Sequence, residues 1–469
     1  MSKLRITELM GMSIQGITAD SRAVKPGFVF AALPGAKQDG RAFIADAVAR
    51  GAAAILAPLG TEWPPGVPER PLLTDAAPRT KLAQIAAELA GPMPETLVAV
   101  TGTNGKTSTV DFLRQILVLS GHRAASLGTL GVIADGLPHA DTLTTPDAVT
   151  LANTLADLAS RGITHAALEA SSHGLEQSRM AGLKLSAGGF TNLTRDHLDY
   201  HGSMAAYRAA KLRLFETLLP RGAPAVAMAD MDKETLAALR DISVRRGLAL
   251  RLVSVADAKA FPGGQLVTAN LPGSRPTEIL NLPGRFQADN AVLAASLAQA
   301  IGVPNAWSYA PKLRGVRGRL ECAATLPNGA AAYVDYAHTP DAIERVLQAL
   351  RPHATGKLII VFGAGGDRDS GKRPLMGAAA ANFADVAIVT DDNPRTENAA
   401  TIRAAIMAAC PGGIEIAERG AAIAAGLNML GLGDVLVVAG KGHEQGQMIG
   451  TEIFPFDDAD VIRALAGTL

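Results

Sequence analysis

The stretch TGTNGKTST at residues 101–109 decides the fold of this chain. It follows the apolar run LVAV at 97–100, which predicts a buried β-strand, and it leads into a helical pattern over 107–121. A strand that runs through a glycine turn into a helix directs backbone N–H groups toward a phosphate. The sequence therefore predicts a phosphate-binding loop, with a chance Gly-Lys-Thr turn as the alternative.

The spacing of this loop differs from the common phosphate-binding pattern, G-x-x-x-x-G-K-[ST]. Where that pattern has its first glycine this chain has Val100, and the nearest glycine is Gly102. The loop is therefore tighter than the common form. We expect the ammonium group of Lys106 to bridge the terminal phosphates of a nucleotide and the hydroxyl of Thr107 to bind Mg²⁺.

The composition limits the classes to which the protein can belong. A chain of 469 residues is too long for one hydrophobic core, so we expect about two to four domains. Lys+Arg and Asp+Glu both number 44, and this zero formal charge argues against a nucleic-acid partner. Two cysteines are too few for a structural zinc site, and no run predicts a signal peptide or a membrane span. We expect a cytoplasmic globular protein with no membrane insertion.

Composition and periodicity divide the chain into three expected domains, over residues 1–92, 93–315 and 316–469. The first contains short strand-like and helical pieces and ends in the linker GPMPET. In the other two, short apolar runs alternate with helical patterns, which is typical of parallel sheets covered on both faces. The fold class is therefore α/β. The predicted strands are 27–33, 53–58, 97–101, 165–170, 187–193, 223–229, 331–336, 357–363, 385–390 and 434–440, and the predicted helices are 42–51, 107–121, 289–302 and 341–350.

Polar residues follow the strands of the middle region. Ligands of parallel sheets bind at the carboxyl ends of the strands, so these residues are candidates for a site. Glu169 closes the strand 165–170, where a carboxylate can hold a metal ion; a solvent-facing glutamate is the alternative. The stretch TNLTRDHLDYHG at 191–202 follows the next strand, and we favour His197 as a metal or phosphate ligand over a structural histidine.

Three loops of the last region have a common polar character. They are GAGGDRDSGKRP at 363–374, DDNPRTE at 391–397 and GKGHEQGQ at 440–447, and each follows a predicted strand. Their arginines, Arg368, Arg373 and Arg395, can pair with carboxylates, and Glu444 can pair with an ammonium group. Together they favour a ligand with both groups, such as an amino acid, over ordinary solvated loops.

These stretches together resemble the Mur ligase family of ATP-dependent amide-forming enzymes. The similarity is carried, in order along nearly the whole chain, by TGTNGKTS, LEASSHGL, TNLTRDHLDYHG, KLRLF, VDYAHTPD, FGAGGDRDSGKRP, DDNPRTE and AGKGHE. The short phosphate loop is the form that this family has. Within the family, DSRAVKPGFVFAALPG, SSHGLEQSR and DNPR resemble the branch that adds meso-diaminopimelate to UDP-N-acetylmuramoyl-L-alanyl-D-glutamate in peptidoglycan synthesis.

The resemblance implies three domains: a small N-terminal α/β domain, a central ATPase-like parallel sheet and a C-terminal Rossmann-like parallel sheet. It also implies ATP and Mg²⁺ as cofactors, a monomer, and Lys106, Lys211 and His197 as catalytic residues. The ATP site would comprise Gly102, Thr103, Asn104, Gly105, Lys106, Thr107, Ser108, Asn290, Arg319 and Asp335. The UDP-muramoyl dipeptide would contact Ala19, Ser21, Thr144, Thr145, Ser171, Gln177 and Arg179. Diaminopimelate would contact Arg368, Asp392, Asn393, Pro394, Arg395, Gly440 and Glu444, and magnesium would be held by Thr107, Glu169, His197 and Lys211.

Two of these residues need the resemblance most. Periodicity places Lys211 on an amphipathic helix, where nothing separates it from Lys184 or Lys233. The resemblance implies a carbamate on Lys211, which ligates a cation as an ammonium group cannot. It also implies that Arg395 pairs with the distal carboxylate that diaminopimelate has and lysine lacks, a pair whose loss costs on the order of 2–5 kcal/mol.

Two other functions remain open at this point. A folylpolyglutamate synthetase would use the same chemistry on another acceptor, but it lacks this N-terminal region and the DNPR stretch. A P-loop NTPase that couples hydrolysis to motion would release ADP without acceptor or amino acid, whereas a ligase requires both.

Overall fold

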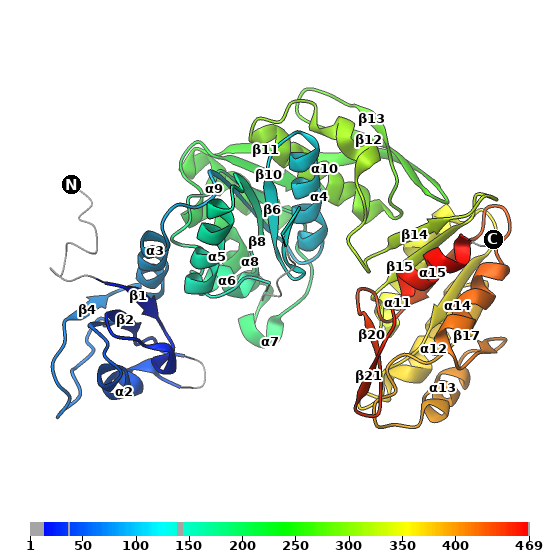
Figure 1. The fold of residues 1–469 in the computed structure, drawn as a ribbon. Coiled ribbons are helices and arrows are strands. Elements are labelled where there is room, and N and C mark those ends of the chain that lie inside the picture. The colour runs from blue at the N-terminus through cyan, green and yellow to red at the C-terminus, as the bar shows by residue number, and fades with distance from the viewer. Residues whose placement is uncertain (1–13, 36–37, 138–143, 468–469) are drawn as a thin grey trace. The chain divides into compact units, whose positions relative to one another are not determined.

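The computed structural model describes residues 14–35, 38–137 and 144–467 (Figure 1). Contacts within the chain divide it into two compact units. One unit is Met1–Leu252 with Leu293–Pro304, and the other is Val253–Val292 with Asn305–Leu469. This division into two units does not test the three domains predicted with boundaries after residues 92 and 315, which stay predictions.

The N-terminal sheet has four parallel strands in the order β1-β2-β3-β4. Alternate residues of β2 point to opposite faces, so that Val29 and Ala31 pack in the cluster that contains helix α3 and Phe30 packs in the cluster that contains α2. The elements are β1 (Gly16–Thr18), β2 (Phe28–Ala31), β3 (Ala54–Pro58), β4 (Leu72–Asp75), α2 (Ile44–Ala49) and α3 (Pro78–Ala90), with 3₁₀-helices at Ser21–Ala23 and Gly40–Phe43.

The central sheet places the phosphate loop at the end of an interior strand. Its strands in the first unit run in the order β10-β9-β5-β8-β6-β7, and β5 pairs in parallel with both β8 and β9. The carboxyl ends of these three strands therefore meet at one edge. The strands are β5 (Thr96–Thr101), β6 (Ala124–Gly128), β7 (Gly131–Ala134), β8 (His165–Glu169), β9 (Ala187–Phe190) and β10 (Pro224–Met228). The helices are α4 (Lys106–Leu119), α5 (Ala148–Ser160), α6 (Ser172–Glu176), α7 (Leu198–His201), α8 (Met204–Arg213), a π-helix (Leu214–Leu218) and α9 (Lys233–Arg246).

The second unit begins with an antiparallel ribbon that the sequence did not predict. It consists of β11 (Ala249–Phe261), β12 (Gly264–Asn270) and β13 (Thr277–Leu280), and β11 carries the chain over from the first unit. The helix α10 (Arg285–Ala300) follows and is divided between the two units at Val292, and a 3₁₀-helix (Ala306–Lys312) comes next in the second unit. Buried His353 attaches the ribbon to the rest of this unit, because one ring nitrogen accepts the N–H of Gly284 at 2.8 Å and the other bonds to the carbonyl of Phe261 at 2.9 Å. Burial lowers the pKa of His353, which fits a neutral ring.

The C-terminal sheet is doubly wound, in the order β14-β15-β19-β16-β17-β18, with β14 antiparallel to β15. Its strands are β14 (Glu321–Thr325), β15 (Ala331–Asp335), β16 (Leu358–Phe362), β17 (Val386–Val389), β18 (Ile414–Glu415) and β19 (Val435–Ala439). One face is covered by α11 (Pro340–Leu350), α12 (Lys372–Phe383) and α13 (Ala399–Met407), and the other by α14 (Arg419–Asn428) and α15 (Asp458–Ala466). A short 3₁₀-helix (Arg351–His353) follows α11, and β20 (Gly446–Ile449) pairs with β21 (Glu452–Pro455) in a hairpin.

Every strand and helix predicted from the sequence is present, with ends that differ by a few residues. The α/β class with parallel sheets is confirmed. Within residues 14–35, 38–137 and 144–467, no helix combines the length and apolar composition that crossing a bilayer requires.

Candidate functional site

The predicted phosphate loop joins β5 to α4, and its glycines are needed for the turn. Gly102 has a φ of 145°, and a Cβ atom there would lie 1.8 Å from the hydroxyl of Thr191. Gly105, with a φ of 82°, is in the left-handed region directly before Lys106, the first residue of α4. Both positions favour glycine. The first N–H groups of the helix have no intrahelical acceptor, so the loop has the donors that an anion requires.

The segment after β9 braces this loop. The N–H of Thr103 donates to the carbonyl of Asn192 at 2.9 Å, and the N–H of Asn104 donates to the side-chain oxygen of Asn192 at 3.0 Å. The hydroxyl of Thr191 donates to the carbonyl of Asn104 at 2.6 Å, and the hydroxyl of Tyr207 donates to that of Thr103 at 3.2 Å. The loop is therefore preformed.

Two lysine side chains meet at the carbonyl oxygen of Gly102. The Nζ atom of Lys106 lies 2.9 Å from it and that of Lys211 lies 2.7 Å from it. Lys211 is in the last turn of α8, is 1% exposed, and has its Nζ 4.4 Å from the centroid of the Tyr207 ring. Burial, and secondly the charge of Lys106, lowers the pKa of Lys211 to about 6, so its amine is mostly neutral at physiological pH.

Glu169 is buried at the end of β8, which excludes the solvent-facing alternative. Its carboxylate accepts the N–H of Thr129 at 2.8 Å and the hydroxyl of the same residue at 3.3 Å. A Cβ atom on Gly128 would lie 2.0 Å from this carboxylate, so the neighbouring strand needs glycine there. Burial raises the pKa of Glu169, while the charge of Lys106 acts in the opposite direction.

His197 lies in a group of aromatic rings next to the loop. It has a φ of 50° at the start of α7, and its Nε2 atom is 3.4 Å from a carboxylate oxygen of Asp196. Its ring centroid is 5.0 Å from that of His173 and 6.2 Å from that of Tyr207, which holds the loop. Burial, and then the charge of neighbouring His197, lowers the pKa of His173.

A cavity of about 390 Å³ within the first unit brings together residues that are far apart in the sequence. Ala19, from the N-terminal sheet region, lines it together with Gln177 and Arg179 from the central region. Ser21 does not line it; this buried side chain hydrogen-bonds to Asp46. The structure thus places three of the residues predicted for the UDP-muramoyl dipeptide around one space.

Three further residues of that predicted set connect the cavity with Glu169. Thr145 donates its hydroxyl to the carbonyl of Glu169 at 2.7 Å and accepts the N–H of Ser171 at 3.0 Å, and its own carbonyl accepts Arg179. The hydroxyl of Thr144 lies 3.1 Å from that of Thr129, which binds Glu169. The cavity wall and the buried carboxylate therefore belong to one hydrogen-bond network.

In the second unit, the carboxylate of Asp335 binds the backbone of Leu320, the residue after Arg319. Both carboxylate oxygens of Asp335 accept backbone N–H groups, one of them from Leu320 at 2.8 Å, and burial raises its pKa. The guanidinium of Arg319 lies 5.0 Å from the centroid of the Tyr336 ring. Asn290 is on α10 and is 5% exposed.

Arg395 is held by its backbone in the loop after β17. It has a φ of 51°, its N–H donates to the carbonyl of Met448 in β20 at 3.1 Å, and its Nη1 atom donates to the carbonyl of Gly366 at 2.7 Å. A Cβ atom on Gly366 would lie 1.9 Å from the carbonyl oxygen of Pro394, so the two loops touch directly.

The other two arginines predicted for an amino-acid ligand have different surroundings. Arg373 is 4% exposed and pairs with Glu397 at 2.8 Å, so it ties one loop to the next. Arg368 is exposed. Of the three arginines, Arg373 therefore has a carboxylate of the chain itself as its partner, which the sequence did not predict.

Asn393 is at the centre of a side-chain network. Its Oδ1 atom accepts the Nζ of Lys441 at 2.9 Å and the N–H of Met448 at 2.9 Å. Its Nδ2 atom donates to Glu444 at 2.8 Å. Asn393 and Glu444, both predicted for the amino-acid site, are thus in direct contact.

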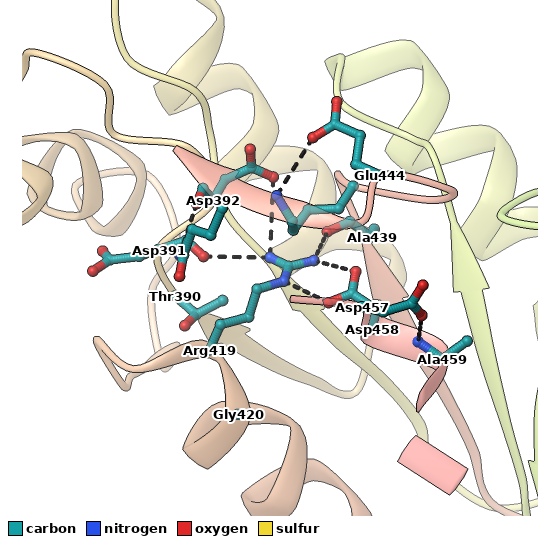
Figure 2. A network of polar contacts seen from close by, with 12 residues as sticks. Thr390, Asp391, Asp392, Arg419, Gly420, Ala439, Glu444, Asp457, Asp458 and Ala459 are labelled. Carbon is teal, nitrogen blue, oxygen red and sulfur yellow. Dashed lines mark hydrogen bonds and ion pairs between the residues drawn. The ribbon is translucent and has the colours of Figure 1, made fainter. Parts of the chain in front are cut away.

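Figure 2 shows Arg419 beneath these loops, at the start of α14. Its guanidinium donates to both carboxylate oxygens of Asp458, each at 2.7 Å, and to the carbonyl of Ala439 at 3.0 Å. One nitrogen lies 4.0 Å from a carboxylate oxygen of Asp392, and a Cβ atom on Gly440 would lie 2.4 Å from that oxygen. A buried ion pair therefore supports the ends of two strands.

The predicted site residues are divided between the two units. The first contains the phosphate loop, Glu169, His197, Lys211 and the cavity residues; the second contains Asn290, Arg319, Asp335 and the three loops. Among the residues that the structure describes, no group of three or more His, Cys, Asp and Glu side chains is arranged to hold a metal ion.

Sequence reasoning missed several contributors. Lys441 stands in the same stretch as Glu444, which was a usable signal. Thr129, Tyr207, Arg419 and Asp458 had no signal in the pattern, because each is a single residue whose importance comes from contacts with distant segments.

Three family models match the chain in order. They are described as "Mur ligase family, catalytic domain" over residues 13–87, "Mur ligase middle domain" over 100–298, and "Mur ligase, glutamate ligase domain" over 318–442.

Two curated relatives carry the name UDP-N-acetylmuramoyl-L-alanyl-D-glutamate–2,6-diaminopimelate ligase. The chain is 54% identical to the one from Caulobacter vibrioides, over 97% of this chain and 96% of that protein. It is 48% identical to the one from Agrobacterium fabrum, over 100% of this chain and 96% of that protein. A solved structure with the same name is 34% identical, covers 97% of this chain and 95% of its own, and has a TM-score of 0.78. Since these similarities extend over nearly the whole length, the chain belongs to the Mur ligase family.

Proposed function

We propose that this chain is the ATP-dependent ligase that joins meso-2,6-diaminopimelate to UDP-N-acetylmuramoyl-L-alanyl-D-glutamate in the synthesis of peptidoglycan precursors. The observation that carries the proposal is the full-length similarity, at 54% and 48% identity, to relatives named for this activity. Three domains, at residues 1–92, 93–315 and 316–469, would present the acceptor, hold ATP and bring the amino acid.

ATP would bind at the loop after β5. Lys106 now donates to the carbonyls of Gly102 and Thr103, both at 2.9 Å, and would exchange these for phosphate oxygens. The preformed loop supports this role, because its donors need little rearrangement to meet an anion. The ATP set would be Gly102, Thr103, Asn104, Gly105, Lys106, Thr107, Ser108, Asn290, Arg319 and Asp335.

The residues beside the loop fit magnesium. The buried carboxylate of Glu169, whose pKa burial raises, would gain from a divalent cation nearby. Thr107 and Glu169 would hold one ion, and His197 with a carbamate on Lys211 would hold a second. When bound, magnesium offsets negative charge on the transferring phosphoryl group.

The surroundings of Lys211 support the carbamate. Only a neutral amine adds to carbon dioxide, and the pKa of about 6 leaves this amine mostly neutral. In the addition, the nitrogen forms a bond to carbon and loses a proton, which yields an anionic oxygen ligand.

The cavity in the first unit supports binding of the acceptor. Arg179 donates to the side-chain oxygen of Gln177 at 2.8 Å, and burial lowers the pKa of this arginine, so an anionic ligand would favour its charged form. The UDP-muramoyl dipeptide set would be Ala19, Ser21, Thr144, Thr145, Ser171, Gln177 and Arg179.

The chemistry follows from the difficulty of forming an amide in water. The side-chain carboxylate of D-glutamate would attack the γ-phosphorus of ATP, which forms an acyl phosphate and releases ADP. The amine of diaminopimelate would then attack the acyl carbon, lose a proton and expel phosphate. Lys106 would offset charge during the first step, and positioning would supply much of the rate.

Arg395 would select the amino acid. Its guanidinium is held at the carbonyl of Gly366 by the Nη1 bond described above, where its other nitrogens can pair with a distal carboxylate. The diaminopimelate set would be Arg368, Asp392, Asn393, Pro394, Arg395, Gly440 and Glu444.

The test is an incubation of the protein with ATP, Mg²⁺, the UDP-muramoyl dipeptide and one amino acid at a time, with the product mass as readout. We expect an adduct of meso-diaminopimelate, with continuous turnover of ATP to ADP only when acceptor and amino acid are both present. Steady release of ADP without either substrate would instead favour a nucleotide-driven switch, and no adduct with any diamino acid would overturn the proposal.

A further inference from the structure

We propose that Lys441 is a positioning residue of the amino-acid site: it fixes the side-chain amide of Asn393 so that one N–H group remains to bind a carboxylate of the incoming amino acid. This inference rests on the function proposed above. Lys441 would touch no substrate and would act through Asn393.

The position of Lys441 leaves its ammonium group few partners. It follows Gly440 after β19, and its side chain is 0% exposed. The Nζ atom lies 2.9 Å from Oδ1 of Asn393 and 3.4 Å from a carboxylate oxygen of Glu444. A buried ammonium group must be hydrogen-bonded, so these contacts determine its geometry.

The contacts of Asn393 determine which way its amide faces. Oδ1 accepts two donors, Lys441 and the N–H of Met448, and an amide oxygen has two lone pairs. Rotating the amide by half a turn would set its NH₂ group against both donors. The orientation with Nδ2 toward Glu444 is therefore strongly favoured.

This orientation leaves one donor for a ligand. An amide has two N–H groups, and one of those on Asn393 donates to Glu444 at 2.8 Å. Among the residues that the structure describes, no acceptor is recorded for the second. Asn393 is in the same loop as Arg395, and its amide contacts Glu444 of the neighbouring loop. A carboxylate that binds between these loops would therefore meet an N–H donor that is already oriented.

A purely electrostatic role toward Glu444 fits the distances less well. The Lys441–Glu444 contact is 0.5 Å longer than the Lys441–Asn393 bond, at 3.4 against 2.9 Å, and the side chain of Glu444 is 36% exposed, so water also reaches it. Arg419 already supports the fold beneath these loops, through Asp458 and main-chain carbonyls. Lys441 differs because its shortest bond ends on a side chain of the site.

The experiment compares Lys441→Met with the native protein in steady-state kinetics for each substrate. Methionine has a similar volume and removes the charge. We expect the KM for diaminopimelate to rise roughly tenfold to hundredfold, because a hydrogen bond to a charged ligand is lost. The KM for ATP should change little. Lys357→Met is the matched control, because Lys357 is exposed at the opposite end of β16.

A double-mutant cycle with Asn393→Leu shows whether Lys441 acts through Asn393. If it does, adding Lys441→Met to Asn393→Leu leaves the KM for diaminopimelate unchanged within about twofold, because the shared contact is already lost. The double variant should also melt at a higher temperature than Asn393→Leu, which leaves a buried ammonium group without that partner. If Lys441→Met alone does not fold, a further rise of the KM for diaminopimelate in the double variant over Asn393→Leu would still overturn the inference.

Three results would overturn the inference: an unchanged KM for diaminopimelate in Lys441→Met, equal rises for ATP and diaminopimelate, or effects that multiply in the double variant. Failure of the proposed function is a separate result, because the native protein would then form no adduct at all.

Discussion

At the scale of single residues, Lys211 acquires its character from its surroundings. The side chain is buried against the ring of Tyr207 and the carbonyl of Gly102, with the ammonium group of Lys106 on the same oxygen. Burial and a like charge both disfavour its protonated form. These conditions favour a neutral amine on Lys211 over the protonated ammonium group of an ordinary surface lysine.

The lowered pKa of Lys211 predicts a pH-dependent stability in buffer depleted of carbon dioxide. The pKa falls from 10.5 to about 6 on folding, so the cost of burying the charge is fully present below about pH 6 and decreases as the pH rises toward 10.5. The native protein should gain stability relative to Lys211→Met between these limits, by up to about 1.4 kcal/mol per pH unit. Urea unfolding at several pH values measures this.

The matched control for that series is Lys184→Met, since Lys184 is exposed in the same unit. Its stability difference from the native protein should be nearly independent of pH in this range. A flat difference for Lys211→Met as well would show that the amine keeps its ordinary pKa.

Arg395→Ala should impair use of the amino acid selectively. Loss of the pair with the distal carboxylate should raise the KM for diaminopimelate roughly thirtyfold or more, with the KM for ATP nearly unchanged. Initial rates with each substrate varied in turn give both values. Arg345→Ala, an exposed position on α11, serves as the control, and equal rises in both KM values would refute the role of Arg395.

The sequence predicted Lys106, Glu169 and Arg395 because each follows an apolar strand in a chemically distinctive stretch. It could not predict the surroundings of Lys211, since a helix pattern shows which face is apolar and not which backbone oxygen lies above it. The same holds for Lys441, whose partner Asn393 is 48 residues away in the chain.

At the scale of elements, two helices are attached to the C-terminal sheet by one buried ion pair. Arg419 is the first residue of α14 and Asp458 is the first residue of α15, and both side chains are fully buried. The same guanidinium binds the carbonyl of Ala439 at the end of β19 (Figure 2). The first residues of α14 and α15 and the end of β19, which leads into Gly440, are therefore joined by one set of contacts.

Asp458→Asn should destabilise the protein by about 3–5 kcal/mol, because it leaves the charge of Arg419 buried without its counter-ion. Asp460→Asn is the control within the same helix: Asp460 is exposed and pairs with Arg463 at 2.9 Å, so its loss should cost less than about 1 kcal/mol. Denaturant unfolding compares the two variants. Similar losses in both would show that the buried pair has no special weight.

Elements with near-continuous apolar runs were predictable, and those without were not. The strand β16 is buried at all five positions, so its sequence LIIVF indicates a strand directly. The ribbon strand β11 is mostly half-buried or exposed and has no such run. The hairpin strands β20 and β21 have no buried residue, and their role in holding Arg395 depends on backbone bonds that no pattern reveals.

At the scale of the whole molecule, the proposed ATP site draws on both units. Residues Gly102–Ser108 belong to the first unit, and Arg319 and Asp335 belong to the second. The loops proposed for the amino acid are also in the second unit, whereas the cavity proposed for the acceptor is in the first. If these assignments are right, the proposed reaction requires both units to bind one set of substrates.

Small-angle scattering should show that the radius of gyration decreases when a non-hydrolysable ATP analogue and the UDP-muramoyl dipeptide are added together. The hypothesis behind this expectation is that the units close around the substrates of the proposed shared site. The analogue alone, added to protein with Lys106→Ala, is the control. An unchanged radius with both ligands bound would contradict closure.

The central claim is that ATP activates the acceptor by placing its γ-phosphoryl group on the glutamate carboxylate. The most direct measurement labels both oxygens of that carboxylate with ¹⁸O and follows the label during turnover with diaminopimelate. The mechanism predicts that each phosphate released carries one labelled oxygen and that the amide product retains the other. Amide formation with unlabelled phosphate would contradict it.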